Sequence, residues 1–182
     1  MPGQPLRDRC ADVSGSDRML VAAVNGLVEA GLRVIVAVPG DGPLVPLLTA
    51  AGADVRRCAT PVLRKSALSP RGLARLALEA LAALPAMIRL VRAEGVDVVY
   101  VNTVTIPVWL LVGRLSGRRV VAHVHEAEAD GGLLHRALSV PLVAAHTVVA
   151  NSEYTRTTHA AAVPALRGRT VVVRNGVVPA PP

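Results

Sequence analysis

Two histidines and a carboxylate follow one another at the end of an apolar stretch, and they are the best candidates for chemistry in this chain. The stretch 120–124 is rich in valine, as a strand buried on both faces is. It contains His123, and His125 and Glu126 follow at its far end. In an open parallel sheet, ligands bind beyond the carboxyl ends of the strands. We therefore expect His125 and Glu126 to line a binding site.

A His-x-His pair near a carboxylate is also a metal-ligand arrangement, because His123 and His125 share one face of a strand. A metal site would need further ligands at other strand ends. His146 begins a predicted strand, and His135 and His159 fall in predicted helices. We therefore predict no metal, and we interpret His123 as a structural histidine. His125 either contacts a bound ligand or is simply held by hydrogen bonds at the strand end.

Two kinds of apolar segment alternate along the chain and predict an α/β fold with a Rossmann-like, doubly wound, mostly parallel sheet. Strands are expected at 32–38, 53–57, 96–101, 120–124, 145–150 and 170–173. Helices are expected at 19–30, with Ser16 as a cap, and at 44–51, 70–94, 105–115, 133–143 and 152–162. Pro85 should kink the longest helix.

The first strand of such a sheet is the weak element. The residues before the turn at 14–18 read LRDRCADV, with four charges in eight positions. A first strand is central and buried in the usual strand order, and each unpaired buried charge costs several kcal/mol. Either this strand is short and poor, or the true N-terminus is absent from this sequence.

Composition narrows the classes of partner. The chain has 182 residues, 52% hydrophobic and 18% charged, which indicates one folded domain. Its net charge of +7 is carried by scattered arginines, and aromatic residues are only 2%, which disfavours a nucleic-acid partner. The two cysteines have no metal or disulfide spacing, and the N-terminus has no signal-peptide pattern. We expect a cytoplasmic protein.

The longest apolar region, 73–91, is interrupted by charges and should not span a membrane. The arginines of the same predicted helix could instead meet anionic headgroups, although a solvated helix face is the more common explanation. A location at the inner face of the membrane therefore stays open.

Four motifs in order resemble the N-terminal domain of glycosyltransferase family 4, the retaining GT-B class. They are a turn before a helix (SGSDR, 14–18), a strand ending in His125-Glu126, a helix start (NSEYTR, 151–156) and a hinge (RNGVV, 174–178). The resemblance covers 14–178, between an irregular segment at 1–13 and a Pro-rich tail at 179–182. It implies transfer of a sugar between two Rossmann-like domains, with a nucleotide sugar as donor and no further cofactor.

The resemblance also implies roles for single residues. His125 and Glu126 would be catalytic, with His125 at the reacting sugar. The donor diphosphate would be bound by Gly15, Ser16 and Arg18. The acceptor cleft would be lined by Asn102, Thr103, Ser152 and Arg156.

We therefore expect the acceptor-binding domain of a hexosyltransferase-like enzyme that acts on a glycan or lipid-linked acceptor. This sequence stops at the hinge, so the C-terminal donor domain is absent and the chain alone should be inactive. The alternative is a non-catalytic sugar- or lipid-binding module, or a decayed remnant. A metal-dependent hydrolase is the least favoured interpretation.

Overall fold

The structure is a computed structural model that describes residues 15–63, 69–125 and 132–176. Its contacts divide the chain into two compact units, residues 1–60 and 61–182. Helices and strands alternate in each unit, and all strand pairings within the described ranges are parallel. The predicted α/β class with parallel strands is therefore confirmed. The division into one domain at 14–178 with flanking segments at 1–13 and 179–182 stays a prediction.

The first unit is a two-stranded parallel sheet with two helices. Its elements are α2 (Gly15–Glu29), β1 (Ile35–Val38), α3 (Leu44–Ala50) and β2 (Asp54–Arg57). Val24 of α2, Val38 of β1 and Leu48 of α3 are buried together with Ala53, and they form the core of this unit. The predicted poor first strand would precede α2 and lies outside the described residues.

Helix α2 begins earlier than the sequence pattern predicts. It includes Gly15, so Ser16 lies within the first turn and is not a cap in front of it. Asp17 in that turn favours the early start, because a carboxylate is stabilised by the positive end of the helix dipole. The predicted end is confirmed: Gly31 has φ 78°, and Leu32 N–H donates to Leu27 O, as in a helix closed by a left-handed residue.

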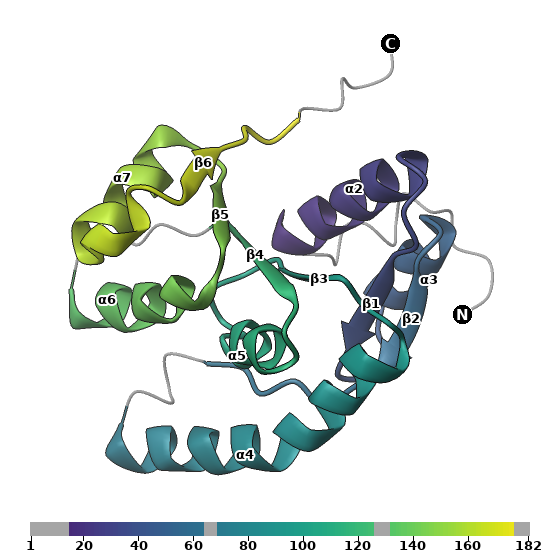
Figure 1. The fold of residues 1–182 in the computed structure, drawn as a ribbon, viewed down its shortest axis with the longest axis horizontal. Helices are drawn as coiled ribbons and strands as arrows, with labels where there is room; N and C mark the ends of the chain where they lie inside the picture. The colour runs from purple at the N-terminus through teal and green to yellow at the C-terminus, as the bar shows by residue number, and fades with distance from the viewer. Residues whose placement is uncertain (1–14, 64–68, 126–131, 177–182) are drawn as a thin grey trace. The chain divides into compact units, whose positions relative to one another are not determined.

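The second unit contains a four-stranded parallel sheet in the order β3-β4-β5-β6 (Figure 1). Its strands are β3 (Val98–Val101), β4 (Arg119–Val124), β5 (Thr147–Ala150) and β6 (Thr170–Val172). Its helices are α4 (Pro70–Ala93), α5 (Val108–Leu115), α6 (Leu133–Ser139) and α7 (Glu153–Ala162), with 3-10 helices η2 (Val140–Ala144) and η3 (Pro164–Leu166).

Proline accounts for two features of these helices. The predicted helix at 133–143 is split, because Pro141 lacks the N–H that an α-helical bond would need, and the chain continues as the tighter η2. Pro85 lies inside α4, whose axis changes direction along its length in Figure 1. No helix in the described ranges is both long and apolar enough to cross a membrane.

The faces of the second sheet differ, although the valine-rich pattern predicts strands buried on both. The residues of one face are fully buried: Val99, Val101, Val120, Ala122, Val124, Val148 and Ala150. Helix α5 packs on this face, against β3 and β4. Tyr100, Val121, Thr147 and Val149 of the other face are only half-buried. This second face carries the polar groups described below, which explains why it is less apolar than the pattern predicts.

A single glycine sets how closely α5 approaches the sheet. A Cβ added at Gly113 would lie 2.5 Å from Val120 Cγ2 and 3.2 Å from Val99 Cβ. We predict that Gly113→Ala lowers the free energy of unfolding by about 1–3 kcal/mol, because the crowded side chains belong to the packed core of the unit. The measurement is urea unfolding followed by circular dichroism.

The matched control is Gly26→Ala on α2, where an added Cβ meets nothing within 4 Å. Alanine is the better helix former, so this change should raise the stability by about 0.5–1 kcal/mol. Equal effects of the two substitutions would contradict the packing argument.

Candidate functional site

The parallel register gathers polar residues on one face of the second sheet, at its carboxyl edge. Strands β3, β4 and β5 pair in sequence, and positions two apart along a strand share a face. The residues that this register places together, counted along the strands and just past their ends, are Tyr100, Asn102, His123, His125 and Asn151. The expected position of His125 at a rim of strand ends is thus present in the structure.

Hydrogen bonds join the ends of three strands around His125. Its Nε2 lies 3.1 Å from Asn102 Oδ1, so the imidazole Nε2–H donates to the amide oxygen after β3. Asn151 after β5 donates through Nδ2 to the carbonyl oxygen of His125 at 3.2 Å. Asn102 is buried and His125 is half-buried. The histidine is therefore held by hydrogen bonds at the strand end, and its contact with a ligand stays a prediction.

His123 lies behind His125 and is more deeply placed. Only 7% of the residue is exposed, and its Nδ1 forms a hydrogen bond with the Tyr100 hydroxyl. Its ring centroid is 4.0 Å from that of His125. Burial, helped by the neighbouring His125, lowers the pKa of His123 to about 4, and burial raises the pKa of Tyr100 to about 12. Both side chains are therefore uncharged at neutral pH.

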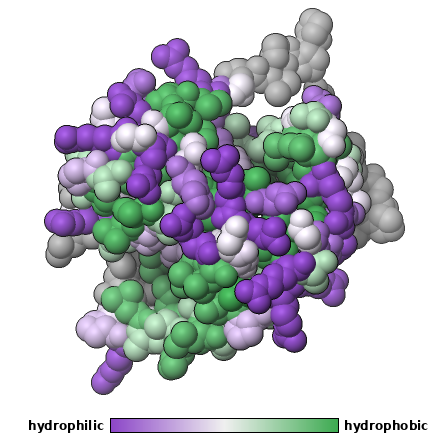
Figure 2. All heavy atoms as spheres, in the orientation of Figure 1, coloured by the Kyte–Doolittle hydropathy of each residue, from purple (hydrophilic) through white to green (hydrophobic). Residues whose placement is uncertain are grey.

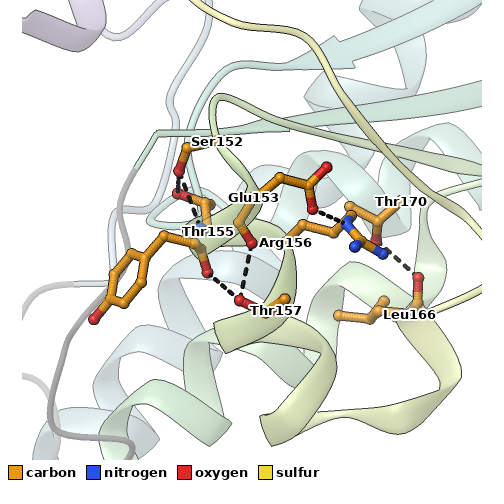
Figure 3. A network of polar contacts seen from close by, with 8 residues as sticks. Ser152, Glu153, Thr155, Arg156, Thr157, Leu166 and Thr170 are labelled. Carbon is orange, nitrogen blue, oxygen red and sulfur yellow. Dashed lines mark hydrogen bonds and ion pairs between the residues drawn. The ribbon is translucent and has the colours of Figure 1, made fainter.

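The first turn of α7 is built from the predicted helix-start motif (Figure 3). Ser152 is the N-cap, and its Oγ accepts from Thr155 N–H at 3.1 Å. Thr155 Oγ1 donates to Asn151 Oδ1 at 2.7 Å, which connects the helix to the strand end. Arg156 Nε lies 2.7 Å from Glu153 Oε2 in an ion pair within the same turn. Ser152 and Arg156 thus both take part in interactions that form the helix start.

Thr103 also takes part in the local structure of its loop. Its Oγ1 accepts from Thr105 N–H at 3.2 Å and lies 3.0 Å from Thr105 Oγ1. These bonds shape the turn between β3 and α5. Thr103 follows Asn102 at the same strand end, so the predicted acceptor residues Asn102, Thr103, Ser152 and Arg156 all lie at or just beyond the carboxyl edge of the second sheet.

The predicted donor-phosphate residues belong to the other unit. Gly15, Ser16 and Arg18 form the first turn of α2, where main-chain N–H groups point out of the helix end and could meet an anion. The contacts within each unit therefore do not bring these three residues together with the residues of the second sheet. Glu126, the predicted catalytic partner of His125, lies outside the described residues.

Within the described ranges, no group of three or more His, Cys, Asp or Glu side chains could hold a metal ion. His123 and His125 share a face as expected, but each ring already points to a protein partner through one nitrogen, Tyr100 for the first and Asn102 for the second. The chemistry that this edge can offer is hydrogen bonding by an imidazole and by carboxamides. Such groups are suited to the hydroxyls of a sugar.

Sequence reasoning missed Tyr100 and Asn151. The sequence pattern predicts Tyr100 only as part of a strand and Asn151 only as part of a helix start. In the structure Tyr100 contacts His123, and Asn151 contacts His125. A signal was present, because Tyr100 stands two positions before Asn102, and Asn151 directly follows β5. Using it would have required the register between strands, which the alternation along one strand does not give.

A second polar cluster joins α6 to α7 and is entirely buried. Ser139 Oγ donates to His135 O at 2.6 Å and lies 2.8 Å from His159 Nδ1. The ring centroids of His135 and His159 are 4.7 Å apart. His135, Ser139 and His159 are each at most 2% exposed. A serine beside a histidine could suggest a nucleophile, but this pair is inaccessible to a substrate. The cluster satisfies buried polar groups between two helices.

The chain, with parallel strands and crossover helices, has the Rossmann-like architecture of one half of a GT-B fold. Similar solved structures support this class. The crystal structure of Anabaena HepE in complex with UDP and glucose matches with a TM-score of 0.65 at 20% identity, covering 90% of this chain and 42% of that chain. HepE in complex with UDP-glucose matches with a TM-score of 0.63 at 20% identity, covering 91% and 42%.

The chain thus spans about two fifths of the length of HepE, and at this identity the likeness shows the fold. Comparison with curated proteins gives no match. The sequence model of Glycosyltransferase Family 4 matches residues 13–180. The chain therefore belongs to Glycosyltransferase Family 4, as the four motifs predicted.

The lowered pKa of His123 predicts a loss of stability in acid. In the unfolded chain His123 takes up a proton at the ordinary histidine pKa of about 6.5. In the folded chain it does so only near 4. Between these values the unfolded state binds more protons, so stability falls as pH decreases from about 6.5 to 4. We predict that His123→Asn removes about 1–2 kcal/mol of the loss between pH 7 and 5, measured by urea unfolding at both pH values.

The control for this measurement is Leu32→Ser, which changes an exposed residue of the first unit that carries no titratable group. It should leave the pH dependence nearly as in the wild type. If His123→Asn loses as much stability between pH 7 and 5 as the wild type does, His123 is not the group responsible.

Proposed function

We propose that this chain is the acceptor-binding half of a retaining glycosyltransferase, which transfers a hexose from a nucleotide sugar to a glycan or lipid-linked acceptor. Membership of Glycosyltransferase Family 4 supports the reaction class. The complexes of the structurally similar HepE with UDP and with UDP-glucose support a nucleotide-sugar donor. A C-terminal donor domain, on further sequence or on a partner chain, would complete the enzyme, and this chain alone would be inactive.

The observation that carries the proposal is the position of His125 at the carboxyl edge. The residue is half-buried, with its Nδ1 inside the protein and its Nε2 held by Asn102, next to the other polar strand ends. In retaining transfer, positive charge develops on the reacting sugar ring as the bond to the leaving group breaks. His125 would contact the hydroxyls of that sugar or stabilise its charge, with Glu126 next to it as the second catalytic residue.

The other predicted residues would bind the two substrates. Asn102, Thr103, Ser152 and Arg156 would contact the acceptor from the same edge. Gly15, Ser16 and Arg18 would meet the donor diphosphate, because a helix N-terminus with a nearby guanidinium favours phosphate. No resident cofactor or metal is required, since the nucleotide sugar is itself the activated substrate.

A lipid-linked acceptor would bring the protein to the inner face of the membrane, and α4 supports such a contact. Its first half exposes Leu73, Leu78 and Leu81 beside Arg71 and Arg75. Hydrophobic residues gather in the lower part of Figure 2, where α4 lies in Figure 1. Apolar side chains next to arginines are suited to an anionic lipid surface.

We predict that the chain sediments with vesicles that contain phosphatidylglycerol and not with pure phosphatidylcholine vesicles. Leu78 and Leu81 are 68% and 66% exposed, so their joint replacement by serine should weaken binding roughly tenfold through the loss of apolar burial. Leu32→Ser, at a leucine of 55% exposure in the first unit, is the control and should bind normally. No binding to either lipid would argue against membrane contact, and equal binding to both would argue against a preference for an anionic surface.

We predict that His125→Ala abolishes sugar transfer when the chain is assayed together with its donor domain and UDP-glucose as the first donor. Stability should change little, because a half-buried side chain at a strand end contributes little packing. Product formation is measured by mass spectrometry, and the midpoint of thermal unfolding is measured in parallel.

His146→Asn is the matched control, since it replaces an imidazole just before β5, away from the carboxyl edge, and keeps a side-chain acceptor for the Val120 N–H. It should retain transfer. Normal turnover of His125→Ala would overturn the catalytic assignment. Sugar binding without transfer by the wild type, in the presence of a donor domain, would favour the non-catalytic module.

A further inference from the structure

Tyr100, His123 and His125 form a row of aromatic groups from β3 to the end of β4. The Tyr100 and His123 rings meet edge to face, with centroids 5.9 Å apart and planes at 69°. The His123 and His125 rings are closer, at 4.0 Å, and tilted by 48°. The row leads from a half-buried phenol, through a buried imidazole, to the imidazole placed at the reacting sugar in the proposed function.

The hydrogen bond between Tyr100 and His123 can be made in two ways. Either the hydroxyl donates to a bare Nδ1, or Nδ1–H donates to the hydroxyl oxygen. Among the described residues, the Tyr100 hydroxyl has no second partner, and His123 Nε2 is buried without one. If Tyr100 accepted, the hydroxyl proton and the Nε2 lone pair would both be without a protein partner among the described residues. If Tyr100 donates, only Nε2–H is unsatisfied, so this arrangement costs less.

We propose that Tyr100 and His123 are positioning residues for His125. The Tyr100 hydroxyl fixes His123 as the tautomer with its proton on Nε2. This ring, packed 4.0 Å from His125, holds the second imidazole in the orientation that donates to Asn102. The role in catalysis rests on the proposed function of His125, whereas the tautomer and the orientation do not.

The uncharged state of His123 is what makes this arrangement useful. Two imidazolium rings 4.0 Å apart would repel each other, so at most one ring of the pair carries a proton on both nitrogens. Burial keeps His123 neutral down to about pH 4, as its pKa shows. A neutral neighbour leaves the positive charge of the sugar transition state without a competing cation behind His125.

Nuclear magnetic resonance of the chain labelled with ¹⁵N-histidine tests the tautomer directly. The chain has five histidines, so the imidazole spectrum is simple, and His123→Asn and His125→Ala assign the two signals. At pH 7 we expect His123 with its proton on Nε2. Tyr100→Phe should convert His123 to a mixture of tautomers and shift the His125 signals. Tyr154→Phe, at a tyrosine of 55% exposure, should change neither.

Transfer kinetics with the donor domain present and UDP-glucose as donor test the consequence. Tyr100→Phe should lower kcat roughly tenfold, the effect of one positioning hydrogen bond, with KM unchanged. Tyr154→Phe should have the wild-type kcat. Should Tyr100→Phe not fold, His123→Asn keeps an acceptor for the Tyr100 hydroxyl and removes the packing ring, and it should shift the His125 signals and lower kcat in the same way.

The outcomes separate this inference from the proposed function. A wild-type His123 with its proton on Nδ1, or His125 signals and kcat that are unchanged in Tyr100→Phe, would overturn the positioning role. Full transfer by His125→Ala together with the expected spectra would overturn the catalytic role and leave the arrangement of the three rings intact. If Tyr100→Phe alters the His125 signals and lowers kcat while Tyr154→Phe changes neither, the positioning role is supported.

Discussion

The site depends on one constraint, the parallel register of β3, β4 and β5. Because neighbouring strands run in the same direction, their carboxyl ends meet at one edge of the sheet. The residues that directly follow β3, β4 and β5 can therefore reach each other without a long loop. Asn102, His125 and Asn151 come together only through this pairing. Gly113 supports it from the other face, since α5 approaches closely enough to pack on Val99 and Val120. Apolar packing on one face thereby holds polar chemistry on the other.

Burying histidines has a cost, and the structure meets it by giving the buried rings hydrogen-bond partners. His123 has Tyr100, and His159 has Ser139, which itself donates to a main-chain carbonyl. The two clusters still differ in use. The one between α6 and α7 is closed to solvent, so it can only join helices. The one on β4 continues to His125, which is half-buried, so in the proposed function its arrangement would reach a substrate.

Sequence patterns predicted the fold well because they depend on local chemistry. Valine-rich runs predicted the strands, and glycines such as Gly31 and Gly117 marked helix ends where φ is positive. Proline explains the split at η2, which the periodicity of leucines could not show. The site was predicted only in part: His125, Asn102 and Ser152 stand at strand ends that the sequence reveals, whereas Tyr100 became relevant only through the register. Long-range pairing is what local patterns lack.

The contacts of the predicted site residues also separate two kinds of role. Ser152 caps α7 and Thr103 shapes the turn after β3, so both contribute to their own local elements. A change at either would alter the fold together with any binding, because the same oxygen serves a main-chain N–H. His125 and Asn102 instead join two different strands through side chains, with no main-chain N–H depending on that bond. In the proposed function, substrate hydroxyls would exchange with this bond while the sheet stays paired.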